Sequence, residues 1–391
     1  MSACYVQAPG VVCAAGWGLP ALSDAVFART PSGVAENQVV WPGHALHLGA
    51  VRGALPSVAH LPIEQRSRNN ALLLAALALV RPAVDATIAH HGARRVGVVL
   101  GTSTSGIAES EAAFAVLARR GAWPAGFHVG QQELGSAAQM LSQLLGLGGP
   151  SFVVSTACSS GAKALASGAR LLKADLCDAV LVGGVDALCA MTVAGFTALD
   201  AVDRVRCRPM SATRAGINIG EGAAIFVLSR EPSAVRLSGC GESSDAHHIS
   251  APEPTGRGAL AAMRAALDRA GLAPSEVGYL NLHGTATLQN DAMESRAVAE
   301  LFGLQLPCSS TKPLTGHALG AAGAIEAAIA WLTLMGDGRL PVHHFDGLRD
   351  PALPPITLVQ PGQRLAGAPR HVMSNSFAFG GNNASLVLSH E

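Results

Sequence analysis

The sequence predicts an α/β protein built from two similar halves, and three observations support this fold class. The stretch from Phe152 to Leu171 has the pattern of a strand that turns into a helix, and glycines concentrate where turns must be tight. Three segments also recur, which indicates two facing units and not a solenoid. The recurring pairs are AAIFVLSR (223–230) with ASLVLSH (384–390), FVVSTACSSGAKAL (152–165) with LPCSSTKPLTGHALGAAGA (306–324), and VGVVLGTSTSG (96–106) with VGYLNLHGTAT (277–287).

The repeat also predicts where the halves divide. The first copy of the repeated strand, AAIFVLSR, ends at Arg230. We therefore expect the boundary between the halves near Glu231 and Pro232, with a short turn and no linker. The halves then span residues 1–231 and 232–391.

Cys158 lies where the first predicted strand turns into a helix. Phe152–Val154 reads as a buried strand, and the run from Ala157 to Leu171 has the composition of a helix. A cysteine at a helix N-terminus meets free N–H groups and the positive end of the helix dipole, which favour a thiolate and can stabilise an oxyanion. The same residue could also be a small buried hydrophobe.

Two histidines stand in Gly- and Thr-rich turns further along the chain. His283 follows the apolar segment GYLNL, and His317 follows LQLPCSST and Lys312. We expect both just past strand ends, where α/β folds build their sites. A nucleophilic Cys with two imidazoles suits chemistry in which a thioester forms and negative charge then develops on a second substrate.

Composition narrows the function classes. Of 391 residues, 14% are charged and 49% are hydrophobic, and the net charge is zero. This composition argues against nucleic acid as the main partner. It also predicts that a second subunit covers much of the surface. The apolar run Ala71–Val80 is too short to span a bilayer and indicates a buried helix. The start MSACYVQAPG has no secretory pattern, and eight cysteines without metal spacing suit a reducing cytosol. We therefore expect a cytoplasmic protein without a metal, and the glycine spacing does not favour nucleotide binding.

Four ordered motifs carry a resemblance to a known family. TACSSG (156–161), HGTAT (283–287), STKPLTGHALGAAG (310–323) and NSFAFGGNNASLVL (375–388) resemble the β-ketoacyl-acyl-carrier-protein synthases of the type I/II branch. That branch belongs to the thiolase-like superfamily, and the similarity runs from Val11 to the C-terminus. It implies five layers, α-β-α-β-α, made of two βαβαβαββ halves. The helices after Cys158 and after His317 would be the buried central pair.

The resemblance also implies roles for single residues. Cys158 matches the nucleophile that takes an acyl chain, while His283 and His317 match the pair that promotes decarboxylation of a malonyl unit. Lys312 matches the family lysine beside the histidines; we expect it to support the site in a buried ion pair with Glu326 or Asp291, and direct catalysis is the alternative. The remaining matches are Thr285 and Thr287 on the pantetheine arm, the N–H groups of Cys158 and Phe379 as oxyanion hole, and Phe379 as the aromatic gate. Phe377 is expected in the core.

The Cys-His-His pattern separates this chain from relatives. Type III synthases carry Asn where His317 stands, degradative thiolases need a second catalytic Cys, and chain-length factors usually lack the nucleophile. Departures from the family pattern leave the substrate open between fatty-acid elongation and a polyketide or aryl-polyene-like pathway. A non-elongating, chain-length-factor-like partner is the alternative function. The departures lie at 209–211, 214–217, Leu288, Ala378 and Asn382.

Partners follow from the same resemblance. Acyl carrier proteins of this class are acidic, so we expect docking on an arginine-bearing rim. The phosphopantetheine arrives on the carrier, and no cofactor of the chain's own is expected. We expect a homodimer, or a heterodimer with a related subunit. Thr104 falls where the family places a residue from the neighbouring subunit at the end of the acyl pocket. The arginines predicted for docking are Arg66, Arg68, Arg204, Arg206 and Arg208.

Overall fold

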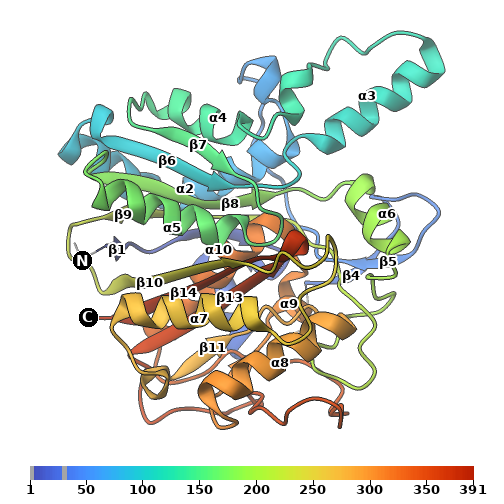
Figure 1. The fold of residues 1–391 in the computed structure, drawn as a ribbon. Coiled ribbons are helices and arrows are strands. Elements are labelled where there is room, and N and C mark those ends of the chain that lie inside the picture. Colours follow the sequence, from blue (N-terminus) through green and yellow to red (C-terminus); the bar gives the residue numbers. More distant parts are fainter. Residues whose placement is uncertain (1–3, 29–32) are drawn as a thin grey trace.

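The computed structural model describes residues 4–28 and 33–391, and its strands fall into two five-strand sets with the same order (Figure 1). The first set runs β7-β6-β8-β9-β2 and the second β12-β11-β13-β14-β10. In each set the first three strands are parallel and the next two pairings are antiparallel. The bounds are β2 Gly10–Cys13, β6 Val96–Gly101, β7 Ser151–Val154, β8 Ala179–Asp186, β9 Gly222–Ser229, β10 Val235–Ser244, β11 Tyr279–Asn281, β12 Cys308–Ser309, β13 His371–Ala378 and β14 Asn382–His390.

This repetition of strand order is the duplication that the sequence predicts, with each recurring segment at the equivalent strand. Strand β1 (Tyr5–Val6) pairs with both β9 and β10 and so joins the two sets. The chain passes from one set to the other between Ser229 and Val235. Strand β3 (Gly16–Trp17) pairs antiparallel with β2, and β4 (Ala35–Asn37) pairs with β5 (Leu46–Leu48) in a separate hairpin.

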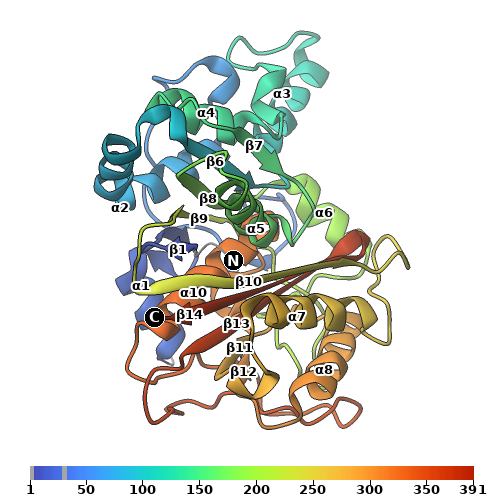
Figure 2. The same ribbon diagram turned by 60° about the vertical axis from the view of Figure 1, so that its left-hand side comes forward.

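Helices form three layers around the two sheets, which gives the thiolase-like five-layered fold (Figures 1 and 2). Helices α2 and α4 contact the first sheet, α5 and α10 lie between the sheets, and α7 contacts β10 and β14 of the second. The helix bounds are α1 Gly18–Phe27, α2 Arg68–His91, α3 Ile107–Arg120, α4 Ser136–Leu145, α5 Ser160–Lys173, α6 Ala190–Ala198, α7 Arg257–Ala270, α8 Leu288–Phe302, α9 Lys312–Thr315 and α10 Ala322–Leu334.

The two central helices touch through glycines. A Cβ added at Gly161 of α5 would lie 2.8 Å from the backbone nitrogen of Ala324, and one at Gly323 of α10 would lie 2.9 Å from that of Ala162. No side chain larger than hydrogen fits at either position without moving a helix backbone. The small-residue content of both helices therefore reflects close helix approach, as the sequence indicates.

The helix predicted around Ala71–Val80 is present and mostly buried, whereas the strand predicted from Phe152 is not buried. The buried helix predicted around Ala71–Val80 is part of α2, whose 24 residues are long and apolar enough to cross a membrane by length and composition. Half of its most apolar window is buried, and it packs on β2, β8 and β9, as the core helix of a globular protein also would. Strand β7 is not buried: it forms a sheet edge, and Phe152 is 39% exposed. All eight cysteines are free thiols.

Candidate active site

The turn that carries Cys158 confirms the predicted strand-to-helix placement. Strand β7 ends at Val154, and α5 begins at Ser160, three residues later than the helix start that the sequence predicts. The turn is held by hydrogen bonds from Thr156 N–H to Ser160 Oγ (2.9 Å) and from Ser159 Oγ to the carbonyl of Thr156 (2.9 Å). Ala157 has φ = +52°, a conformation that non-glycine residues rarely adopt. The strained turn aims Cys158 away from the helix start and into the site.

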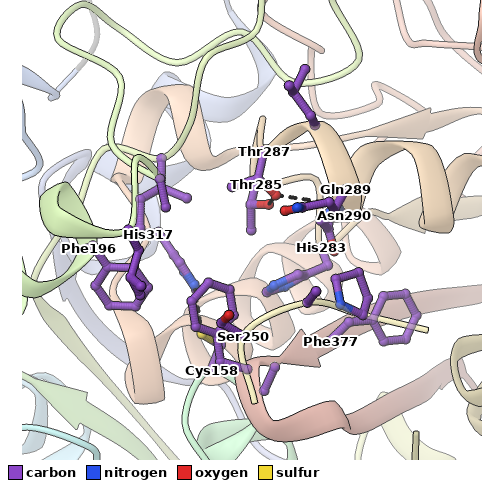
Figure 3. A pocket seen from close by; sticks show the side chains of 18 of the residues that line it. Cys158, Phe196, Ser250, His283, Thr285, Thr287, Gln289, Asn290, His317 and Phe377 are labelled. Atoms are coloured by element: carbon purple, nitrogen blue, oxygen red, sulfur yellow. Dashed lines mark hydrogen bonds between the residues drawn. The ribbon is translucent and has the colours of Figure 1, made fainter. Parts of the chain in front are cut away.

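The second half of the chain brings both histidines to this sulfur. His317 Nε2 lies 3.0 Å from Cys158 Sγ, and the ring centres of His283 and His317 are 5.4 Å apart (Figure 3). His283 follows β11 directly, as predicted. His317 does not follow its strand directly, because α9 intervenes between β12 and the histidine. Its backbone is fixed instead by bonds with Asn218 (2.7 Å) and Gly220 (2.9 Å).

Burial controls the protonation of all three groups. It lowers the pKa of His283 and of His317 well below the ordinary imidazole value, and nearby Lys312 lowers both further. Burial also raises the pKa of Cys158 to about 12, although Lys312 and the N–H groups of Phe379 and Cys158 itself oppose the shift. The thiolate that the helix end would favour is therefore not the resting state. The site holds a thiol and two neutral imidazoles at neutral pH.

Lys312 forms the buried ion pair that the sequence predicts, with Glu326 as its partner. Its Nζ donates to Glu326 Oε1 and to the carbonyl of His283, both at 2.5 Å, and the residue is 1% exposed. Burial raises the pKa of Glu326, and Lys312 counteracts the shift. Asp291, the other predicted partner, accepts instead from Met210 N–H at 2.7 Å and lies 3.9 Å from Arg214. Lys312 thus fixes the backbone of His283 without facing the cavity.

Glu294 is a member of the site that the sequence analysis missed. Its carboxylate accepts from the backbone N–H groups of His283 (2.8 Å) and Gly284 (2.7 Å). Burial raises the pKa of Glu294 to about 7. Its one sequence signal is its position one helical turn after Asp291, on the buried face of α8.

A cavity of about 360 Å³ opens beside the three reactive groups (Figure 3). Thr285 and Thr287 line it, and their hydroxyls lie 3.1 Å apart. Phe377 is 5% exposed, as predicted for a core residue, but it also lines the cavity beside His283. The lining also includes residues that the sequence did not point to, among them Phe196, Leu199, His248 and Ser250.

The segment around Phe379 lies at the same cavity. The Phe379 ring stacks at a tilt on Phe196, with ring centres 5.3 Å apart, and Gly380 and Gly381 adopt positive φ to complete the turn. Ala378, where the family pattern has glycine, has φ = −113° and needs no glycine freedom. Asn382 accepts a hydrogen bond from Lys163 at 3.2 Å.

Other predicted residues lie elsewhere. Thr104 does not line the cavity: it is 1% exposed, and its hydroxyl donates to Asp186 at 2.9 Å. Arg68 is not a free surface cation, because it binds the buried Glu221 through Nε (2.8 Å) and Nη2 (2.5 Å). Arg208 lies 3.5 Å from Asp203 and 3.8 Å from Asp346. Arg66, Arg204 and Arg206 are exposed.

Among residues 4–28 and 33–391, two groups of side chains have the spacing of metal ligands, although the sequence predicted no metal site. The ligand atoms of Cys158, His283 and His317 lie within 4.8 Å of one another, and so do those of exposed His90 and Glu231 with His91. The first group is the reactive constellation itself. Its geometry accommodates either a soft metal ion or the thioester chemistry that the motifs indicate.

Comparison with known protein families finds a match in each half of the chain. Residues 67–234 match the model of the β-ketoacyl synthase N-terminal domain, and residues 234–346 match that of the C-terminal domain. The chain is 34% identical over 350 residues to 3-oxoacyl-[acyl-carrier-protein] synthase 2 of Staphylococcus aureus, covering 84% of this chain and 86% of the relative.

Solved structures of the same family superpose closely on this chain. A chain of the complex titled ketosynthase (ApeO) with its chain length factor (ApeC), from Xenorhabdus doucetiae, superposes with a TM-score of 0.94 and 44% identity, covering 100% of this chain and 98% of that one. A β-ketoacyl synthase from Burkholderia phymatum superposes with a TM-score of 0.87 and 28% identity, and all of both chains is covered.

The resting protonation of Cys158 predicts how it responds to pH. Because its pKa is near 12, alkylation of Cys158 by iodoacetamide should accelerate about tenfold per pH unit from pH 7 to pH 10, without a plateau. Peptide mass spectrometry locates the adduct, and Cys158→Ala is the control for the other seven thiols. A plateau below pH 8 would show a resting thiolate and contradict this description.

Proposed function

This chain belongs to the β-ketoacyl synthase family, which transfers acyl groups and forms carbon–carbon bonds by Claisen condensation, and we propose that it is the elongating ketosynthase of a specialised polyketide or aryl-polyene-like pathway. The observation that carries the proposal is the meeting of Cys158, His283 and His317 at one cavity. Fatty-acid elongation uses the same chemistry and differs in the acyl chain.

The first half-reaction loads an acyl group on Cys158. The thiol proton passes to neutral His317 Nε2, 3.0 Å away, and the sulfur attacks the thioester carbonyl of the acyl carrier protein. The N–H groups of Cys158 and Phe379 hold the oxyanion, and the carrier thiolate leaves with the proton that His317 received. The products are an acyl-cysteine and the free carrier thiol, and the imidazole is neutral again.

The second half-reaction consumes a malonyl thioester. Loss of CO₂ leaves an electron pair that the thioester carbonyl takes up as an enolate. His283 and His317 stabilise the enolate oxygen in the tautomers that carry the proton on Nε2. His317 accepts through Nε2 during acyl loading, so it must first exchange its proton from Nδ1 to Nε2. The enolate carbon attacks the acyl-Cys158 carbonyl, the carbon–sulfur bond breaks, and the Cys158 thiolate takes up one proton from solvent, which the overall condensation consumes. Lys312, bonded to the carbonyl of His283, and Glu294, bonded to its N–H, fix the position of that imidazole.

The proposed pathway is supported by residues that line the cavity and depart from the family pattern. Several departures from the family pattern line the cavity: Ala215, Ile217, Leu288 and Ala378. They alter its shape and leave the reacting groups in place. The relative from Xenorhabdus doucetiae, at 44% identity, comes from a ketosynthase complex with a chain length factor, which favours a specialised pathway over primary fatty-acid elongation. The alternative, a silent chain-length-factor-like subunit, is disfavoured because the complete reactive constellation would have no use there.

We propose two partners on the same grounds. An acidic carrier protein would dock on the exposed arginines Arg66, Arg204 and Arg206. A related subunit would cover the edge strand β7 and the apolar surface near α3, which an isolated chain leaves open to water. That surface includes Phe114 (56% exposed) and Trp123 (49% exposed), whose rings are in contact.

The two half-reactions predict separable defects. Intact-mass spectrometry should show one acyl adduct after incubation with acyl carrier protein, and Cys158→Ala should abolish it. His283→Ala and His317→Ala should each lower CO₂ release from malonyl carrier protein by about a hundredfold or more, because each removes a donor to the enolate. His283→Ala should still accept the acyl group.

Exposed His90→Ala is the matched control and should behave as the wild type in both assays. An adduct that survives Cys158→Ala would refute the nucleophile. Normal CO₂ release by both histidine variants would refute their role, and a protein that loads no acyl chain at all would favour the silent-subunit alternative.

The partner surface predicts an assembly defect. Light scattering of the chain co-expressed with its partner subunit should give the mass of a dimer, and Phe152→Asp should shift it toward the monomer by placing a charge on the paired edge strand. Val39→Asp, at an 84% exposed apolar residue near the β4–β5 hairpin, is the control and should leave the dimer intact. A fully active wild-type monomer would contradict the proposal.

A further inference from the structure

Asp186 is a buried carboxylate at the place where the two halves meet. It is the last residue of β8 and is 0% exposed. Four bonds reach its Oδ1, from the hydroxyl of Thr102 (2.7 Å), the N–H of Ser103 (2.8 Å), and the N–H (2.8 Å) and hydroxyl (2.9 Å) of Thr104. Two reach its Oδ2, from the hydroxyl of Ser103 (2.5 Å) and the N–H of Gly320 (2.5 Å).

These donors come from both halves of the chain. Residues 102–104 form the loop after β6 in the first half, whereas Gly320 lies three residues after His317 in the second. Gly320 also has no room for a side chain, since a Cβ there would lie 2.7 Å from Asp186 Oδ2. Asp186 therefore ties the loop after β6 to the segment that carries His317.

The turn after His317 needs such a tie. Leu319 has φ = +46°, a strained conformation for a side chain branched at Cγ, and it lies directly before Gly320. The bond from Gly320 N–H to Asp186 holds the far side of this turn, while the bonds of His317 with Asn218 and Gly220 hold the near side. The imidazole is thus fixed from both ends of its segment.

The second half fastens its equivalent loop in the same way. The loop after β11 has its N–H groups bound by the buried carboxylates of Glu294 (from His283 and Gly284) and Asp291 (from Ala286, at 3.2 Å). Each half therefore uses buried carboxylates to hold the loop that borders the site. In the first half the carboxylate comes from the neighbouring strand and also reaches across to the other half.

We propose that Asp186 is a positioning residue for the condensation: it sets the placement of His317 against Cys158 and contributes the negative charge behind the nucleophile. This inference rests on the proposed function for its catalytic part. No described side chain forms a salt bridge with Asp186, so its charge is balanced by hydrogen bonds alone.

The charge acts on the thiol. The groups that influence Cys158 are His317 at 3.0 Å, His283, Lys312 and Asp186, and of these Asp186 raises the pKa of the thiol whereas Lys312 lowers it. Removal of the negative charge must therefore lower the thiol pKa and increase the thiolate fraction at any pH below it. Loosening of the fold would also lower the thiol pKa, because burial raises it, so the charge-restoring variant Asp186→Glu is needed to separate the two causes.

Asp186→Asn tests both parts, because it keeps the size of the side chain but loses the charge and one acceptor. Iodoacetamide should alkylate Cys158 about three- to tenfold faster at pH 8 than in the wild type, since one pKa unit corresponds to a tenfold change in thiolate fraction. CO₂ release from malonyl carrier protein should fall about tenfold in kcat with KM nearly unchanged. Asp186→Glu, which restores the charge, should return the alkylation profile toward the wild type.

Asp178→Asn is the matched control, because it removes a carboxylate just before the opposite end of β8 together with its ion pairs to Arg95 and Arg230. It should change neither the alkylation profile nor kcat. If Asp186→Asn cannot be purified, Ser103→Ala removes one Oδ2 partner and should accelerate hydrogen exchange in residues 317–322. A wild-type alkylation profile and kcat in Asp186→Asn, or protected exchange in Ser103→Ala, would overturn the proposal. The alkylation assay needs no substrate, so it stands even if the proposed function fails.

Discussion

The close approach of α5 and α10 is the constraint on which the rest of this structure depends. Their contact at Gly161 and Gly323 brings the start of one central helix against the start of the other. Cys158 precedes the first helix and His317 precedes the second, so the 3.0 Å contact between sulfur and imidazole is a direct consequence. Neither half could form the site alone. The duplication therefore matters for function because it supplies two different loops to a single seam between the halves.

Burial at that seam then sets the chemistry. Low polarity around the site keeps the imidazoles neutral and the thiol protonated, so both histidines remain able to donate or accept a proton at neutral pH. Charged groups are present but are paired or bonded behind the reacting atoms, as with Lys312 and Glu326. They fix loop positions, and breaking one such buried pair by removing a single partner would cost about 3–5 kcal/mol. Burial where the two halves meet is thus the common cause of the rigid loops and of the neutral reacting groups.

The sequence predicted the α/β duplication and the three reactive residues because strand-to-helix turns, repeated segments and motif order are local properties. It could not decide between Glu326 and Asp291 as partner of Lys312, because that depends on which helix faces the lysine. Asp186 escaped notice because its donors come from loops distant in sequence, and the one signal for Glu294, its position one helical turn after Asp291, was not used. The expected thiolate at Cys158 was wrong because the helix end was weighed without burial. The hydrogen bonds of Thr104 to Asp186 and of Arg68 to Glu221 could not be foreseen either, because these partners are distant in sequence.

The central claim is that both histidines are neutral in the resting site, and ¹⁵N NMR of labelled imidazoles tests it most directly. Spectra of the full-length purified protein between pH 5.5 and pH 8 should show His283 and His317 as neutral tautomers throughout. Burial holds the pKa of each imidazole well below its ordinary value of about 6.5. Imidazolium signals from His283 or His317 with a midpoint near 6.5 would contradict the account.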